Sequence, residues 1–314
     1  VGGPAHTSGM QGPFVGSEAL RAGRLTRHTL RTRFVAVFPD VYVPTGAPLT
    51  AIAKAKAAHL WTGRDGTVAG RSAAALHGAN WVDARQPAEV LWHNRRAPRG
   101  LRMWSDRCAD DEVQALGGIR VTTPERTALD IACRYPRGPA VAAIDALARA
   151  TRMKTADVEL LADRHKGRRG IRTARETLNL VDPGAESPQE TYLPLMVIDN
   201  GFPPPQTQIP VYDECGGLIA VLDMGWEGMM IALDYEGDHH RETRAAFNKG
   251  IRRHDAVTGR GWTDIRVTSV DSEGGVIARL TQVWCQRLCA LGEDPDSGPP
   301  WTHVRRPIRP GRPR

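Results

Sequence analysis

The densest collection of chemically active side chains lies in residues 218–241, where acidic residues and two adjacent histidines interrupt an apolar stretch. Two apolar runs, Leu218–Trp226 and Met229–Tyr235, flank the pair Glu227 and Gly228. A two-residue turn between apolar runs predicts an antiparallel β-hairpin. This hairpin is the element that must position the acids.

Three acids of the hairpin are expected to share one of its faces. If the two central residues form the loop, Asp223 lies opposite Ala232, with Asp234 as its diagonal neighbour. Glu236 follows on the same face because strand side chains alternate with period two. The three carboxylates then lie within roughly 7–8 Å of one another. Such a cluster suits a hard cation such as Mg²⁺ or Mn²⁺, and the alternative is an acidic strand end that runs into solvent.

The order of these residues resembles the PD-(D/E)XK nuclease superfamily, most closely its Vsr-like branch of small endonuclease domains. In that branch an aspartate ends one strand, an acid-x-acid-Gly run lies on the next, and a histidine follows. Asp223, Asp234-Tyr235-Glu236-Gly237 and His240 occupy those places, and Glu190 matches a glutamate on an upstream helix. The resemblance covers about residues 186–291. The motif lysine of the superfamily is replaced here by Glu236, and loss of this lysine is usual within the branch.

The resemblance implies a metal-dependent endonuclease that hydrolyses phosphodiester bonds. Asp223, Asp234 and Glu236 are the expected ligands of Mg²⁺ or Mn²⁺, and Glu190 is a further candidate for the shell. A bound metal would lower the pKa of its water and neutralise charge on the phosphate. His240 is expected to position or deprotonate the water, or to protonate the leaving oxygen. These five residues are the candidate catalytic groups.

Two other interpretations stay open at this point. A non-enzymatic repressor could keep the nuclease fold only as a platform for binding or dimerisation, which the missing lysine favours. Retention of the acids favours catalysis, because a scaffold has no reason to hold like charges on one strand face. The third interpretation is a zinc site made by Cys215, His239 and His240, although no fourth ligand has suitable spacing.

The composition is that of a globular protein whose basic charge favours a polyanionic partner, and the alternative is the arginine preference of a high-GC genome. The chain has 314 residues, 41% of them hydrophobic, and a net charge of +7 carried mostly by arginine. Arginine suits phosphate contacts through its bidentate fork, so a polyanionic partner is expected. No apolar run is long enough for a membrane span, and the N-terminal residues lack the pattern of a signal peptide, which predicts a cytoplasmic protein without membrane contact. Five scattered cysteines predict neither a disulfide framework nor a zinc knuckle.

The N-terminal region has the element order of a winged helix-turn-helix. Helical spacing over Val15–Ala22 is followed by a turn, a second helix capped by Thr26, and strands at Phe34–Phe38 and Val41–Val43. In such modules the second helix enters the major groove of DNA. The candidate DNA contacts lie on or beside that helix, although a solvated basic face is the alternative: Arg24, Arg27, Arg31 and Arg33.

Four short motifs between residues 14 and 133 are similar to the N-terminal half of AbiEi-like antitoxins. They are Ser17–Leu20, Val41–Pro44, Ser72–Gly78 and Thr123–Asp130. The resemblance implies that the winged helix binds operator DNA and that a following domain supports binding or partner contact. It also implies a cognate toxin as a partner.

The predicted fold is a mixture of α+β and α/β domains. Residues 1–13 and a basic tail at 293–314 are expected to be disordered, because both are rich in Gly and Pro. Between them we predict a winged helix-turn-helix at 14–85, a small middle α+β domain at 86–183 and a restriction-endonuclease-like α/β domain with a mixed sheet at 184–292. In the middle domain Glu125 and Asp130 are assigned to capping and surface pairing, and the basic loop 166–170 to phosphate contact or solvation.

Overall fold

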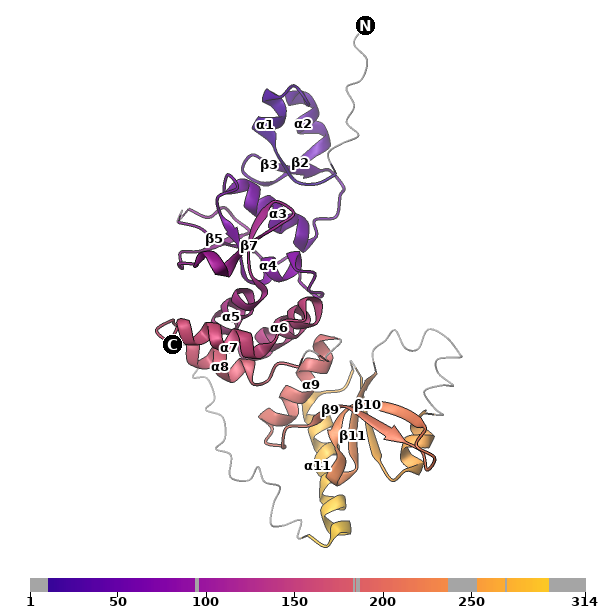
Figure 1. Cartoon of the computed structure of the whole chain (residues 1–314). Helices are drawn as coiled ribbons and strands as arrows, with labels where there is room; N and C mark the ends of the chain where they lie inside the picture. Colours follow the sequence, from indigo (N-terminus) through magenta and orange to yellow (C-terminus); the bar gives the residue numbers. More distant parts are fainter. Residues whose placement is uncertain are drawn as a thin grey trace, which may run out of the picture. The chain divides into compact units, whose positions relative to one another are not determined.

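A computed structural model describes residues 11–93, 96–182, 184, 187–236, 253–268 and 270–293. The chain divides into two compact units, 1–188 and 189–314, and each is described by itself (Figure 1). His239 and His240 lie outside the described residues, and so do the side chains of Glu190 and Glu236. Among the described helices, none is long and apolar enough to cross a membrane.

The first unit begins with two short helices and a small antiparallel sheet. Thr26 caps the second helix by accepting a hydrogen bond from the Thr29 backbone N–H, as the sequence predicts. Ala19, Leu25 and Leu30 are buried beneath the two helices. The elements are β1 (Phe14–Val15), α1 (Gly16–Arg21), α2 (Arg27–Arg33), β2 (Phe34–Phe38) and β3 (Val41–Pro44), with the strands in the order β1-β3-β2.

A five-stranded sheet forms the middle of this unit, with strands in the order β6-β5-β4-β8-β7. The predicted domain boundary between residues 85 and 86 falls inside this sheet, because β4 precedes it yet pairs with β5 and β8. The α3 and α4 helices pack against the sheet through a core of small residues. The elements are α3 (Ala51–Trp61), β4 (Thr67–Val68), α4 (Gly70–Leu76), β5 (Ala88–Leu91), β6 (Leu101–Trp104), η1 (Asp110–Glu112), β7 (Val113–Leu116) and β8 (Ile119–Thr122).

Four helices complete the first unit and share a core of Ala, Leu and Ile side chains. The first of them starts with Thr123 as its cap and Pro124 at its first position. His77 packs inward, with its Nε2 2.8 Å from the Thr122 carbonyl oxygen. The helices are α5 (Pro124–Arg134), α6 (Arg137–Thr151), α7 (Thr155–Arg164) and α8 (Ile171–Leu178).

The second unit is a four-stranded mixed sheet between helices. The strand order is β12-β11-β10-β9, with β11 and β12 parallel and the other neighbours antiparallel. Along β11, Ile231 and Leu233 join a core with α9 and α11, whereas Ala232 joins a second core with Val257. Because alternate strand residues face opposite sides, both faces of the sheet are covered. The elements are α9 (Pro188–Asp199), β9 (Gln206–Tyr212), β10 (Leu218–Trp226), η2 (Glu227–Met229), β11 (Ile231–Glu236), β12 (Thr263–Thr268) and α11 (Glu273–Leu291), with helical residues at 253–259.

The hairpin of this sheet forms, but its predicted register is wrong by two residues. Trp226 pairs with Ile231 rather than with Met229, because the connection is a four-residue loop. The loop is one turn of 3₁₀ helix followed by Met230 in a left-handed conformation, with φ of 53°. Continuing this register places Asp223 opposite Asp234 instead of opposite Ala232.

Candidate functional sites

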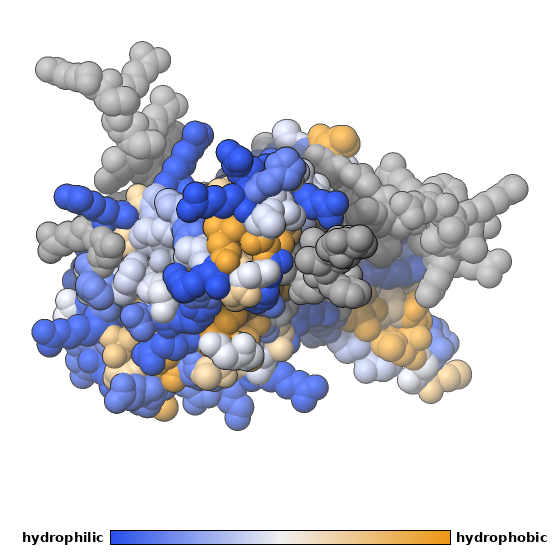
Figure 2. Space-filling view, turned by 90° about the horizontal axis from the view of Figure 1, so that it is seen from above, coloured by the Kyte–Doolittle hydropathy of each residue, from blue (hydrophilic) through white to orange (hydrophobic). Residues whose placement is uncertain are grey.

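The α2 helix presents an arginine-rich surface to solvent. Arg24, Arg27, Arg31 and Arg33 are all exposed, as expected for DNA contacts. Within the described part of the chain, the side chains of Arg27 and Arg31 form no hydrogen bond or ion pair. Figure 2 shows the molecule from above, from the end that carries α1 and α2 in Figure 1, with hydrophilic side chains around a central hydrophobic patch. The guanidinium groups of Arg27 and Arg31 are therefore available to a ligand.

An ion pair ties α1 to the helix that follows the small sheet. The Arg64 guanidinium donates two hydrogen bonds of 2.7 Å to the two carboxylate oxygens of Glu18. These bonds lower the pKa of the Glu18 carboxyl below its ordinary value. Arg64 lies just beyond α3, so the pair connects the helix-turn-helix segment with the part of the unit that contains the five-stranded sheet.

In the second unit, Asp223 and Asp234 lie side by side where the pairing of β10 with β11 ends. The Asp223 backbone N–H donates to Asp234 Oδ1 at 2.9 Å, and the Tyr235 N–H donates to Asp223 Oδ2 at 3.1 Å. The two carboxylates thus replace ladder hydrogen bonds between the strands. The structure brings this predicted pair together more closely than the sequence register implied.

A basic side chain compensates the acid pair. Arg253 Nη1 lies 2.7 Å from Asp234 Oδ2. Burial raises the pKa of Asp234 to about 6, and Arg253 offsets only part of that effect, while the nearby Asp223 and Asp264 add to it. Asp234 is therefore ionised at neutral pH but becomes protonated in mild acid.

Asp234→Asn should change how the stability of the second unit depends on pH. The folded-state pKa of Asp234 is about 6, above its ordinary value of 3.8, so the fold favours the protonated form. The associated stability is complete below pH 3.8 and is lost as pH rises through 6. Between pH 4 and 7 the wild type should lose up to about 3 kcal/mol relative to the variant. Urea unfolding curves at the two pH values, followed by tryptophan fluorescence, measure this difference, and the exposed Asp255→Asn is the control.

A pH-independent difference between wild type and Asp234→Asn would contradict this assignment. The same outcome for both Asp234→Asn and Asp255→Asn would mean that the pH dependence arises elsewhere in the fold.

The described residues supply an incomplete metal shell. Among them, no group of three or more His, Cys, Asp or Glu side chains is arranged to hold a metal ion. Asp223 and Asp234 provide two carboxylates, and the Arg253 guanidinium already lies against one of them. Cys215, the cysteine of the zinc interpretation, is exposed in the turn between β9 and β10. The described residues at this site therefore do not by themselves fit a divalent metal ion.

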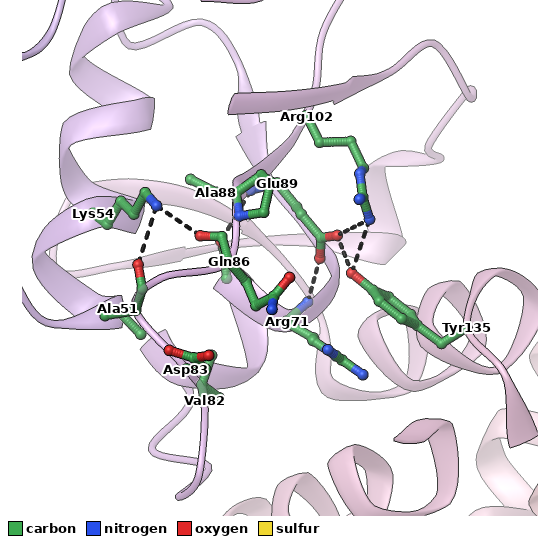
Figure 3. Close-up of a pocket in the computed structure, with 13 residues that line it drawn as sticks. Ala51, Lys54, Arg71, Val82, Asp83, Gln86, Ala88, Glu89, Arg102 and Tyr135 are labelled. Carbon is green, nitrogen blue, oxygen red and sulfur yellow. Dashed lines mark hydrogen bonds and ion pairs between the residues drawn. The ribbon is translucent and has the colours of Figure 1, made fainter. Parts of the chain in front are cut away.

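In the first unit, a pocket that the sequence did not predict surrounds the buried carboxylate of Glu89 (Figure 3). One oxygen accepts hydrogen bonds from the Tyr135 hydroxyl and from Arg102, and the other accepts from the Arg71 backbone N–H at 2.8 Å. The Arg71 guanidinium stacks over the Tyr135 ring, 3.9 Å from its centroid. Burial raises the pKa of Glu89, which these donors only partly offset. The arrangement fastens β5 to α4 and to the end of α5.

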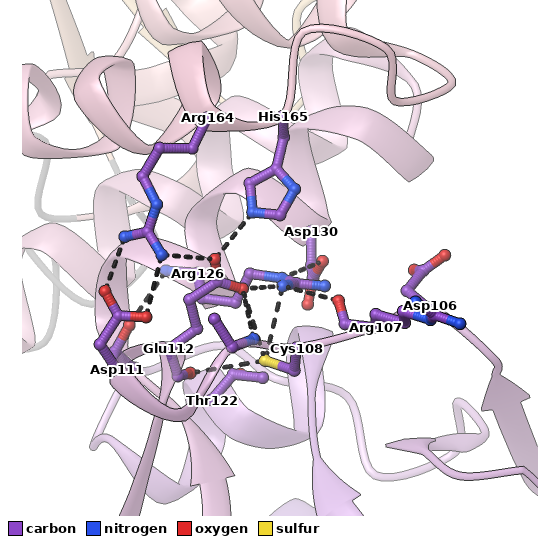
Figure 4. Close-up of polar contacts among 12 residues, drawn as sticks. Asp106, Arg107, Cys108, Asp111, Glu112, Thr122, Arg126, Asp130, Arg164 and His165 are labelled. Carbon is purple, nitrogen blue, oxygen red and sulfur yellow. Dashed lines mark hydrogen bonds and ion pairs between the residues drawn. The ribbon is translucent and has the colours of Figure 1, made fainter.

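A second buried cluster is centred on Arg126, which lies between Glu112 and Asp130 (Figure 4). Asp130 is fully buried, so its predicted role in surface pairing is wrong. Arg168, from the basic loop, points inward to Asp130 rather than to solvent or phosphate. The sequence concealed this cluster because its acids and arginines come from segments far apart in the chain.

The other members of the Arg126 cluster are a histidine and a thiol. His165 Nε2 lies 2.8 Å from Glu112 Oε1. Burial alone would raise the pKa of Glu112, but His165 and Arg126 outweigh burial and lower it. Burial raises the pKa of the Cys108 thiol to about 12, so this thiol stays protonated and unreactive. These properties indicate a structural cluster rather than a catalytic one.

The middle of the first unit matches a known family. Residues 67–180, from β4 to just beyond α8, match the AbiEi antitoxin C-terminal domain. The segments Ser72–Gly78 and Thr123–Asp130, which carried the resemblance in sequence, lie inside this match, whereas Ser17–Leu20 and Val41–Pro44 lie outside it. The Glu89 pocket and the Arg126 cluster thus belong to the AbiEi-like part of the chain.

Two proteins of Mycobacterium tuberculosis, from the strains CDC 1551 and H37Rv and both described as uncharacterised, are similar to the chain. Each is 33% identical over 173 residues, which cover 54% of this chain and 64% of the relative. The chain therefore spans a little less than two thirds of the length of these relatives. No solved structure matches the chain significantly. None of these comparisons indicates a Vsr-like nuclease domain.

Proposed function

We propose that the chain is a DNA-binding regulator of the AbiEi antitoxin type, with α2 as its recognition helix. One observation carries the proposal: a helix, turn, helix and hairpin with an exposed arginine face directly precede a domain that matches the AbiEi antitoxin C-terminal domain. This order is that of a winged helix-turn-helix followed by an antitoxin domain.

The local structure of α2 supports this role. Leu30 anchors the helix from below, and the Thr26 cap fixes its N-terminal end. Arg27 and Arg31 are four residues apart and so share one exposed face. Arginine on such a face contacts phosphates and the edges of guanine bases. The β2 and β3 strands, which follow α2, are the expected wing.

The proposed DNA target is an operator, which the resemblance to AbiEi-like antitoxins implies. A cognate toxin is the second expected partner. The toxin contact is assigned to the AbiEi-like part, residues 67–180, since the family match lies there.

Arg27→Ala combined with Arg31→Ala should weaken DNA binding about tenfold or more. Each lost phosphate contact also reduces the slope of log K against log[salt] by about 0.9, so the double variant should flatten the slope by about 2. Fluorescence anisotropy with a labelled duplex of the region upstream of the chain's own gene, at several salt concentrations, measures both quantities.

The matched control is Arg172→Ala, an exposed arginine on α8 in the same unit. It should leave both the affinity and the salt slope unchanged. If the α2 variant binds like wild type while Arg172→Ala weakens binding, the DNA surface lies on another part of the unit.

Metal-dependent phosphodiester hydrolysis by the second unit is the other candidate function. The observation that favours it is the close pair Asp223 and Asp234 at the end of the hairpin pairing. Glu190, Glu236 and His240 are the further proposed members of the site, and Mg²⁺ or Mn²⁺ is the proposed cofactor. Nicking of a supercoiled plasmid that requires Mg²⁺ and is lost in Asp223→Asn would establish this function. A protein that binds DNA but does not nick the plasmid would support the DNA-binding regulator and not the nuclease.

A further inference from the structure

The acid pair of the second unit, Asp223 and Asp234, lies beside basic side chains of the same unit. Asp223 is on β10, Asp234 on β11 and Asp264 on β12, so each of three neighbouring strands contributes one acid. The side chains of Asp234 and Asp264 are almost completely buried, at 5% and 3% exposed. Buried like charges of this kind require a compensating cation.

The cations come from the first two residues of the helical segment 253–259 and from β12. Arg253 pairs with Asp234 at 2.7 Å, and His254 Nδ1 lies 2.8 Å from Asp264 Oδ2. Arg266 Nε is 3.4 Å from the same carboxylate oxygen. Each of the two buried carboxylates thus already has a positively charged or protonatable neighbour within the chain.

Arg253 also holds the two strands at the point where they stop pairing. Its Nη1 lies against Asp234 on β11, and its Nη2 donates to the Val221 carbonyl oxygen on β10 at 2.6 Å. One guanidinium therefore bridges both strands beside the two carboxylates. A hard metal ion bound by Asp234 through the same oxygen would have to displace this group.

We propose that Arg253 is the built-in cation of this site, so that the second unit keeps its acid pair together without a divalent metal. Arg253 supplies the charge that a metal would otherwise supply and blocks its place on Asp234. This inference concerns the second unit alone and does not rest on the proposed role in DNA binding. It opposes the metal-dependent hydrolysis given as the other candidate function, so the same Mn²⁺ titration decides between the two.

The proposal predicts that removing the guanidinium creates a metal site. In Arg253→Met the apolar side chain keeps a similar length but takes the cation away from Asp234. The full-length variant should bind Mn²⁺ at least about tenfold more tightly than wild type, and millimolar Mn²⁺ should raise its Tm by several degrees. Wild-type Tm should be the same in EDTA and in millimolar Mn²⁺.

Two further variants complete the test, which uses isothermal titration with Mn²⁺ and thermal unfolding. Arg260→Met removes a basic residue that directly follows the helical segment and whose Nη1 lies 3.5 Å from Oε1 of the exposed Glu214, and it should gain no Mn²⁺ binding. Arg253→Met with Asp234→Asn should lose the gained site. If Arg253→Met alone fails to fold, this double variant should restore folding, because it removes both members of the pair.

Three results would overturn the proposal. The first is wild-type protein that binds Mn²⁺ with a stoichiometry of one and loses that binding in Asp234→Asn. The second is an Arg253→Met variant that folds and is as insensitive to Mn²⁺ as wild type. The third is a double variant that remains unfolded where the single variant is unfolded.

Discussion

Arg126→Met is expected to lower the free energy of unfolding of the first unit by about 3–5 kcal/mol. The Arg126 side chain is 1% exposed and lies between two buried carboxylates, those of Glu112 and Asp130. Methionine fills a similar volume but leaves both acids without this partner. Glu112 keeps His165, and Asp130 keeps Arg168, so the loss arises from incomplete compensation of two buried charges.

Urea unfolding of the full chain, followed by circular dichroism, measures the effect of Arg126→Met. The matched control is Arg169→Met, since Arg169 is exposed in the neighbouring basic loop and should cost less than about 0.5 kcal/mol. A loss below about 1 kcal/mol for Arg126→Met would show that the acids find other partners, and would contradict a central role for Arg126.

Gly70→Ala should destabilise the same unit by about 3 kcal/mol, for a steric reason. Gly70 opens α4 with φ of +54°, a left-handed conformation that an alanine adopts with strain. A Cβ there would lie 2.3 Å from Glu89 Oε2 and 2.4 Å from the Trp104 ring. Both neighbours are buried, so the added methyl would push Glu89 away from its donors.

Gly117→Ala separates the strain of the backbone from the collision. Gly117 also has a positive φ, +57°, but no atom lies within 4 Å of the position of its Cβ. It should therefore cost only about 1–2 kcal/mol. Equal losses for the two variants, measured by thermal unfolding, would contradict the proposed contact of Gly70 with Glu89.

Local sequence signals were sufficient for the first two helices and for the existence of the hairpin. Thr26 caps α2, the helix that the sequence assigned to it. These signals act through neighbouring backbone groups, so they need no tertiary context. The pattern of apolar residues located β10 and β11 for the same reason.

Features that depend on tertiary contacts or on an unusual backbone conformation were predicted wrongly or missed. The register of the hairpin depends on Met230, a non-glycine residue in a left-handed conformation that turn propensities do not indicate. Asp130 looked like a surface acid because its partners, Arg126 and Arg168, include one that lies 38 residues away. The pocket around Glu89 was not predicted for a similar reason. Arg71, near the start of α4, and Tyr135, just beyond the end of α5, enclose the carboxylate from segments far apart in the chain.

The Glu18 and Arg64 pair makes the helix-turn-helix segment sensitive to ionic strength from within. Both side chains are partly exposed, at 37% and 49%, so dissolved ions screen their attraction. Salt would therefore weaken the link between α1 and the segment that follows α3. In the proposed DNA complex this adds a second effect of salt to the release of counterions from the phosphates.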